Sequence, residues 1–235
     1  FDWSATQLGD EGLFQRDTAL RPPTVLFAAD VDGDGLPDLA VAVEWGAIRI
    51  YRNHDGQFED ITVPRGLGPA TGLWTSVATG DFDGDGRLDL VCGNWGRNSL
   101  YELCAPSPPR IYYRDWVGDG VVQLLECCQA GDGWHALRDR TWLARGMPTL
   151  LERFTTHQAF SEAAVDAIIP GGADKASYLE ARILDSVVYL NRGSNFVAVP
   201  LPRAAQLTPV FSLNVGDCDG DGRDDVFVAQ NFYGT

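Results

Sequence analysis

The sequence predicts an all-β fold that carries metal-binding loops and is interrupted by a helical insertion. The motif DxDGDGxxD occurs three times, starting at Asp30, Asp81 and Asp217, and each copy lies between two short apolar runs typical of buried strands. Between Gly131 and Leu184 the apolar residues change to helical spacing. With 235 residues, 45% of them hydrophobic, the chain is long enough to bury a substantial core.

Each motif is expected to form a tight loop between two antiparallel strands. The apolar runs that follow the three copies are LAVAVEW, LVCGNW and VFVAQNF. Runs of this length, rich in Val and aromatic residues, favour strands over helices. The loops are therefore predicted to be strand–loop–strand units.

The spacing of the carboxylates indicates calcium. Calcium takes six to eight oxygen ligands, and a loop with carboxylates at positions 1, 3, 5 and 9 and a backbone carbonyl at position 7 supplies them. Glycines at positions 4 and 6 allow the backbone to turn with positive φ. A solvated Asp/Gly turn is the alternative for one copy, and three matching copies argue against it. The expected ligands are Asp30, Asp32, Asp34, Asp38, Asp81, Asp83, Asp85, Asp89, Asp217, Asp219, Asp221 and Asp225, with the carbonyls of Leu36, Arg87 and Arg223.

The EF-hand shares the first half of this pattern, but the second half excludes it. An EF-hand needs a Glu at position 12 and helices on both sides of the loop. Position 12 is Val41, Cys92 or Val228 here, and the flanking segments are strands.

A fourth, worn copy lies in IYYRDWVGDGVVQLLE. Asp115 and Asp119 occupy positions 1 and 5, whereas Val117 and Gln123 replace the carboxylates at positions 3 and 9. We expect this loop to keep its fold and to bind calcium weakly or not at all.

The net charge of −15 and the scarcity of basic residues argue against nucleic acid as a partner. Phosphate binding needs clustered basic residues, and the chain has one lysine, Lys175, and scattered arginines. Twelve of the 33 acidic residues are expected ligands. Three bound Ca²⁺ ions would add six positive charges and change the net charge from −15 to −9. The sequence contains no run of eighteen apolar residues, so it predicts no membrane span.

The five cysteines show neither a zinc site nor a CxxC motif. One or two disulfides are possible, and Cys92 is close enough to Cys104 in sequence for the two to bridge neighbouring strands. Cys127, Cys128 and Cys218 are the remaining thiols. Weak calcium sites of this type belong outside the cytosol, so we expect an exported protein: extracellular, periplasmic or on the cell surface.

A longer repeat surrounds the loops. YRNHDGQFEDITVPRG, from Tyr51, parallels YLNRGSNFVAVPLPRA, from Tyr189, with Tyr, Asn, Phe, Pro and Arg in the same order. The opening FDWSATQLG is similar to FEDITVPRG. We therefore expect the chain to begin and to end within a repeat.

These residues resemble the FG-GAP or VCBS repeats of integrin alpha chains and bacterial surface proteins. The resemblance covers roughly residues 1–125 and 183–235. It implies a β-propeller in an extracellular setting, with the DxDGDGxxD loop joining two strands of each blade. The worn repeat and the insertion are most similar to exported bacterial relatives of cartilage acidic protein, of the ASPIC/UnbV type.

The expected organisation has three parts. Residues 1–126 form blades with two calcium loops and the worn loop, residues 127–182 form a mainly helical insertion, and residues 183–235 form a further blade with the last loop. About four repeats favour a partial propeller completed elsewhere over a closed four-bladed ring, because relatives have more blades. The insertion is either a partner-binding element or a cap over one blade.

Catalytic motifs are sparse. The three histidines show no metal-pair spacing, and no serine lies in GxSxG. Trp45, Trp95 and Phe232 recur at matching places and are either ligand-facing aromatics or packing between blades. We predict a non-catalytic calcium-binding repeat protein that acts in protein or glycan binding, in adhesion, or as an accessory subunit. The alternative is the propeller domain of a secreted polysaccharide-active hydrolase or lyase.

Overall fold

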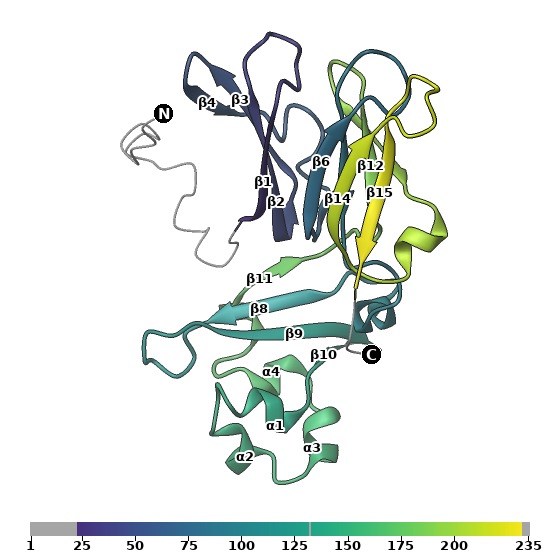
Figure 1. Ribbon diagram of the computed structural model, residues 1–235. Helices are drawn as coiled ribbons and strands as arrows, with labels where there is room; N and C mark the ends of the chain where they lie inside the picture. Colours follow the sequence, from purple (N-terminus) through teal and green to yellow (C-terminus); the bar gives the residue numbers. More distant parts are fainter. Residues whose placement is uncertain (1–22, 132, 232–235) are drawn as a thin grey trace. The chain divides into compact units, whose positions relative to one another are not determined.

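The computed structural model describes residues 23–131 and 133–231 (Figure 1). The chain divides into a first unit, Phe1–Ser99 with Arg182–Thr235, and a second unit, Leu100–Ala181. Strands dominate the described residues, and all the strand pairs are antiparallel. None of the described helices is long and apolar enough to cross a membrane.

The first sheet of the first unit is a meander in the order β1-β2-β3-β4. Its strands are β1 (Pro23–Ala29), β2 (Asp38–Ala47), β3 (Arg49–His54) and β4 (Gln57–Asp60), and β5 (Thr71–Leu73) pairs with the far end of β2. Ala29 pairs with Asp38, so the first motif closes the β1–β2 hairpin. This is the strand–loop–strand unit that the sequence predicts.

The second sheet is assembled from two distant stretches of sequence. Its order is β13-β12-β7-β6, with β6 (Ser76–Gly80), β7 (Asp89–Gly93), β12 (Val187–Asn191) and β13 (Phe196–Pro200). Val187 on β12 pairs with Cys92 on β7. The second unit is therefore inserted between the second and third strands of this sheet.

The third motif joins β14 (Val210–Gly216) to β15 (Asp225–Gln230), which form a two-stranded sheet after a 3₁₀ turn, η5 (Arg203–Gln206). From Asp81 to Asp217 the sequence advances 136 positions. Leaving out the 82 residues of the second unit reduces this to 54, close to the 51 positions between Asp30 and Asp81. The repeat thus keeps one period through the first unit.

The core of the first unit lies between its sheets. Ala40, Ile50, Trp74, Leu90 and Tyr189 are all buried in one cluster. Trp74 and Tyr189 meet edge to face, with ring centroids 6.1 Å apart. β2 is buried on both faces over Leu39–Val43, which explains its continuous apolar run.

The second unit has one sheet with short helices packed against it (Figure 1). The sheet order is β10-β9-β8-β11, with β8 (Arg110–Arg114), β9 (Gln123–Ala130), β10 (Gly133–Ala136) and β11 (Ser177–Glu180). The helices are α1 (Arg140–Leu143), α2 (Leu150–Arg153), α3 (His157–Ser161) and α4 (Val165–Ile168), flanked by 3₁₀ turns η3 (Leu100–Cys104) and η4 (Ala173–Lys175).

Helical structure occurs where the apolar spacing predicts it, but each α-helix has only four or five residues. Asp139 and Thr156 cap α1 and α3 by accepting hydrogen bonds from backbone N–H groups. Leu150, Phe160 and Ile168 anchor three of these turns in the cluster formed with the sheet. Tertiary packing holds helices of this length, which are too short to be stable alone.

The second unit begins at Leu100, whereas the sequence places the start of the insertion at residue 127. The difference arises because the worn loop joins β8 and β9 of the second unit's own sheet. The worn repeat is thus part of the inserted unit and not of the first unit's run of sheets.

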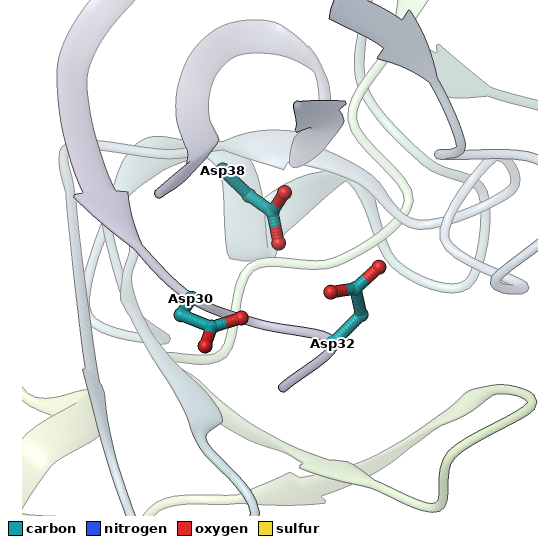
Figure 2. Close-up of side chains that lie close together, drawn as sticks. All are labelled: Asp30, Asp32 and Asp38. Atoms are coloured by element: carbon teal, nitrogen blue, oxygen red, sulfur yellow. The ribbon is translucent and has the colours of Figure 1, made fainter. Parts of the chain in front are cut away.

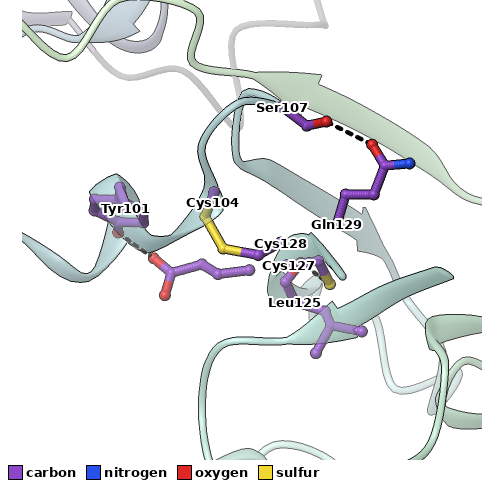
Figure 3. The surroundings of a disulfide bond; sticks show 8 residues. Tyr101, Cys104, Ser107, Leu125, Cys127, Cys128 and Gln129 are labelled. Atoms are coloured by element: carbon purple, nitrogen blue, oxygen red, sulfur yellow. Dashed lines mark hydrogen bonds between the residues drawn. A yellow bond between two sulfur atoms is a disulfide. The ribbon is translucent and has the colours of Figure 1, made fainter. Parts of the chain in front are cut away.

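The disulfide joins Cys104 to Cys128, with Cα atoms 4.8 Å apart, so the Cys92–Cys104 bridge that the sequence left open does not form (Figure 3). Cys92 lies on β7 with its side chain in the hydrophobic core of the first unit. On β9 successive side chains point to opposite faces, so Cys127 enters the core while Cys128 reaches Cys104 on η3.

Thiol labelling of the native protein is expected to modify Cys218 alone. Burial raises the pKa of the Cys92 and Cys127 thiols, whereas Cys218 is exposed. Ellman's reagent should titrate one thiol under native conditions and three in denaturant without reductant. Cys218→Ser should abolish the native reaction, and rapid labelling of that variant would contradict this assignment.

Candidate metal centre

Three carboxylate clusters lie at one end of the first unit's hairpins. They are Asp30, Asp32 and Asp38 in loop 1, Asp81, Asp83 and Asp85 in loop 2, and Asp217, Asp219 and Asp225 in loop 3. In each cluster one ligand atom from every residue lies within 4.8 Å of the others. Figure 2 shows the loop 1 carboxylates directed toward a common space.

The first Asp of each loop organises the backbone around it. Asp30 accepts hydrogen bonds from the N–H groups of Gly33 at 2.8 Å and Gly35 at 2.9 Å. Both glycines have positive φ, +81° and +89°, which brings their N–H groups inward. Asp81 and Asp217 make the equivalent pairs of bonds at 2.7–3.0 Å.

The last Asp of each loop closes it. Asp38 is fully buried and accepts hydrogen bonds from Val31 N–H at 3.0 Å and Asn53 N–H at 2.9 Å. Asp89 is buried in the same way and accepts from Phe82 and Asn191. Burial raises the pKa of both carboxyl groups, although these hydrogen bonds partly offset it. A cation beside them would favour their ionised form.

Two asparagines that sequence reasoning did not single out support these loops. Asn53 donates from its side-chain amide to Pro37 O at 3.0 Å, and Asn191 donates to Leu88 O at 3.0 Å. The two residues lie on β3 and β12, the strands that pair with the strand after each loop, and they hold these strands against the loop's last turn. The signal was available, because these are the Asn residues shared by the YRN and YLN segments of the repeat.

Arginines from the neighbouring strands contact the loop carboxylates. Arg52 lies 2.6 Å from Asp32 Oδ2, and Arg192 contacts Oδ2 of Asp83 at 2.5 Å and of Asp85 at 3.0 Å. The hydrogen bond from Arg192 lowers the pKa of Asp83. Arg87, at position 7 of loop 2, pairs with Asp85 as well.

The donor set of loop 2 fits a hard cation. Arg192 takes Oδ2 of Asp83, and Asp83 Oδ1 is buried without a hydrogen-bond partner. An unpaired buried carboxylate oxygen is costly, and a cation among the carboxylates would satisfy it. Oxygen-only donors at this spacing suit Ca²⁺.

The remaining expected ligands lie at the margin of the clusters. Asp34, Asp89 and Asp221 fall outside the closest groups of three. At position 5, Asp34, Asp85 and Asp221 each accept a hydrogen bond from the N–H of position 7, which is Leu36, Arg87 or Arg223, at 2.8–3.0 Å. These Asx turns set the backbone whose carbonyls are the expected seventh-position ligands.

The worn loop keeps this frame with fewer charges. Asp115 accepts from Gly118 and Gly120, as the first Asp does elsewhere, and these hydrogen bonds lower its pKa. Gln123 Oε1 accepts from Trp116 N–H at 2.7 Å, the bond that Asp38 makes to Val31. A neutral amide therefore replaces the closing carboxylate without loss of the loop, whereas Val117 removes the carboxylate expected at position 3.

The matching aromatic residues differ in exposure. Trp45 is 6% exposed and has a positive φ of 58°, at a bulge in the β2–β5 pairing. Trp95 is partly buried. Phe232 lies outside the described residues. The burial of Trp45 favours packing over ligand contact at that position.

A comparison with protein families locates the repeat. Residues 30–92 match the FG-GAP-like repeat. The matched segment starts at Asp30, the first residue of loop 1, and ends in β7, so it spans loops 1 and 2 and the strands between them. The FG-GAP-like assignment agrees with the resemblance drawn from the loop motif. No curated protein matched the chain.

Proposed function

We propose that the protein is a non-catalytic, calcium-binding repeat protein of the exported type, in which about three Ca²⁺ ions stabilise the first unit. The observation that carries this proposal is the convergence of three carboxylates in each of loops 1, 2 and 3, with one ligand atom from every residue within 4.8 Å of the others. Asp residues at positions 1, 3, 5 and 9 and the carbonyl at position 7 would hold each ion. When bound, the ion supplies positive charge that offsets the mutual repulsion of the carboxylates.

The exported setting is supported by the Cys104–Cys128 disulfide, because structural disulfides form in oxidising compartments. We further propose that the sheets of the first unit belong to a propeller, and that the chain is closest to the ASPIC/UnbV type of exported bacterial relative. The FG-GAP-like match and the similar repeat spacings, of 51 and 54 positions, support the propeller proposal.

Its role is proposed to be the binding of a protein or glycan outside the cell, in adhesion or as an accessory subunit. Apolar side chains exposed around the worn loop support a protein partner. Val117, Val121, Val122 and Trp142 are each at least 43% exposed, and three of them line a cavity of about 470 Å³ in the second unit.

Calorimetric titration of the chelator-stripped protein with Ca²⁺ tests the proposal. We expect a stoichiometry near three, with loops 1, 2 and 3 occupied and the worn loop empty. Absence of binding heat at millimolar Ca²⁺, with no change in the melting temperature, would overturn it.

A further inference from the structure

Loops 2 and 3 are joined directly by two hydrogen bonds between Asp81 and Asp224. Asp81, the first residue of loop 2, donates its N–H to Asp224 Oδ2 at 2.8 Å. In return, Asp224 donates its own N–H to Asp81 O at 2.9 Å. Asp224 is position 8 of loop 3 and is not one of the expected ligands. These two bonds form what we call the Asp81–Asp224 clasp.

The chain leaves room for this clasp. Gly80 precedes Asp81, and a Cβ atom at Gly80 would lie 2.9 Å from Asp224 Oδ2 and 2.6 Å from Val215 Cγ1. Any larger residue there would push the two loops apart. Close approach of loop 3 to the start of loop 2 is therefore built into the sequence.

A second link joins loops 1 and 2. The amide of Asn191 donates both to Leu88 O in loop 2 and to Val31 O, 2.9 Å away, in loop 1. Asn191 N–H also donates to Asp89 Oδ1, which closes loop 2. With 1% of its surface exposed, this residue is a fixed bridge between two loops.

We propose that the loops bind Ca²⁺ cooperatively, with Asp224 and Asn191 as the positioning residues that transmit the coupling. This inference rests on the proposed function. An ion in loop 3 would fix positions 7 and 9, Arg223 and Asp225, on either side of Asp224. Asp224 then holds the backbone of Asp81, the first ligand of loop 2. Part of the conformational entropy cost of ordering loop 2 is thereby offset before loop 2 binds its own ion.

The coupling is measurable loop by loop with ¹H–¹⁵N NMR during a Ca²⁺ titration of the whole chain. Each loop contains a reporter amide at position 6, because Gly35, Gly86 and Gly222 donate to the first Asp of their loops at 2.8–3.0 Å. The variant Asp219→Ala removes an exposed ligand from loop 3. We expect it to raise the midpoint of the Gly86 transition in loop 2 about five-fold or more.

Two further variants test the route of coupling. Asp224→Ala removes the Oδ2 acceptor but keeps the backbone bond from Asp224 N–H to Asp81 O, so in that background Asp219→Ala should raise the Gly86 midpoint by clearly less than in the parent chain. Asp224→Asn keeps an oxygen that accepts from Asp81 N–H, so in that background Asp219→Ala should still raise the Gly86 midpoint about five-fold or more. Both variants retain all the expected ligands of loop 3.

The outcomes separate the two proposals. If none of the three glycine amides moves with Ca²⁺, calcium binding itself fails, and the coupling fails with it. If all three move but Asp219→Ala leaves Gly86 unaffected, the loops bind independently and only the coupling is overturned. A lower Gly86 midpoint in that variant would indicate repulsion between the ions and would also overturn it.

Discussion

Removing calcium is expected to lower the free energy of unfolding of the first unit by about 8 kcal/mol. Each site at a hundredfold excess of ligand over its Kd contributes about 2.7 kcal/mol, because the ion binds the folded loop and not the unfolded chain. For a unit of this size the change corresponds to a melting temperature lower by on the order of 15 °C or more. Calorimetric scans in Ca²⁺ and in chelator measure it.

A matched pair of variants shows whether the loops are responsible. Asp85 and Asp119 both occupy position 5, and each accepts one hydrogen bond from the N–H of position 7, at 3.0 and 2.9 Å. Alanine at either position removes the same turn bond. Asp85→Ala should in addition abolish at least a third of the calcium-dependent gain, whereas Asp119→Ala should leave that gain unchanged. Equal calcium-dependent losses in the two variants would contradict the assignment of the worn loop.

Asn191→Ala is expected to destabilise the first unit by about 3 kcal/mol even in chelator. The side chain donates to Val31 O and Leu88 O and accepts from Arg65 Nη2 at 2.8 Å. Its removal leaves these groups without partners in a buried site, at about 1 kcal/mol or more for each. Urea unfolding followed by tryptophan fluorescence in chelator measures the change without a contribution from the ion.

Asn195→Ala provides the control for this substitution. Asn195 lies four positions further along, is exposed, and accepts one bond from the hydroxyl of Ser194 at 3.3 Å. The same change in side chain should therefore alter stability by less than about 0.5 kcal/mol. Similar effects of the two substitutions would mean that Asn191 is not the bridge between loops 1 and 2.

The motif spacing made the loops predictable because their structure is local. The bonds from Gly33 and Gly35 to Asp30 span three and five residues, and the glycines permit the positive φ that those bonds require. The apolar runs on either side also form the expected strands, because the pattern that predicts a strand is local as well. The helical turns of the second unit follow their apolar spacing, although tertiary packing limits them to four or five residues.

Long-range pairing was not predictable from these patterns. Proximity in sequence allowed a bridge between Cys92 and Cys104, yet β7 places the Cys92 side chain in the core of the first unit. The disulfide depends instead on the alternation of β9, which brings Cys128 to Cys104. Likewise, the worn loop reads as one more repeat, and its place in the second unit follows from the partners of β8 and β9.

The strand–loop–strand repeat, the oxygen-rich loops and the helical turns of the insertion were predictable from local patterns, because each depends on residues within a few positions of one another. The folded structure was needed to show that the second unit interrupts the second sheet, that Asn191 bridges two loops and that Asp224 clasps Asp81. These contacts join residues 102–160 positions apart. Sheet pairing and burial select such contacts, and a local pattern carries no information about which distant strand will lie beside it.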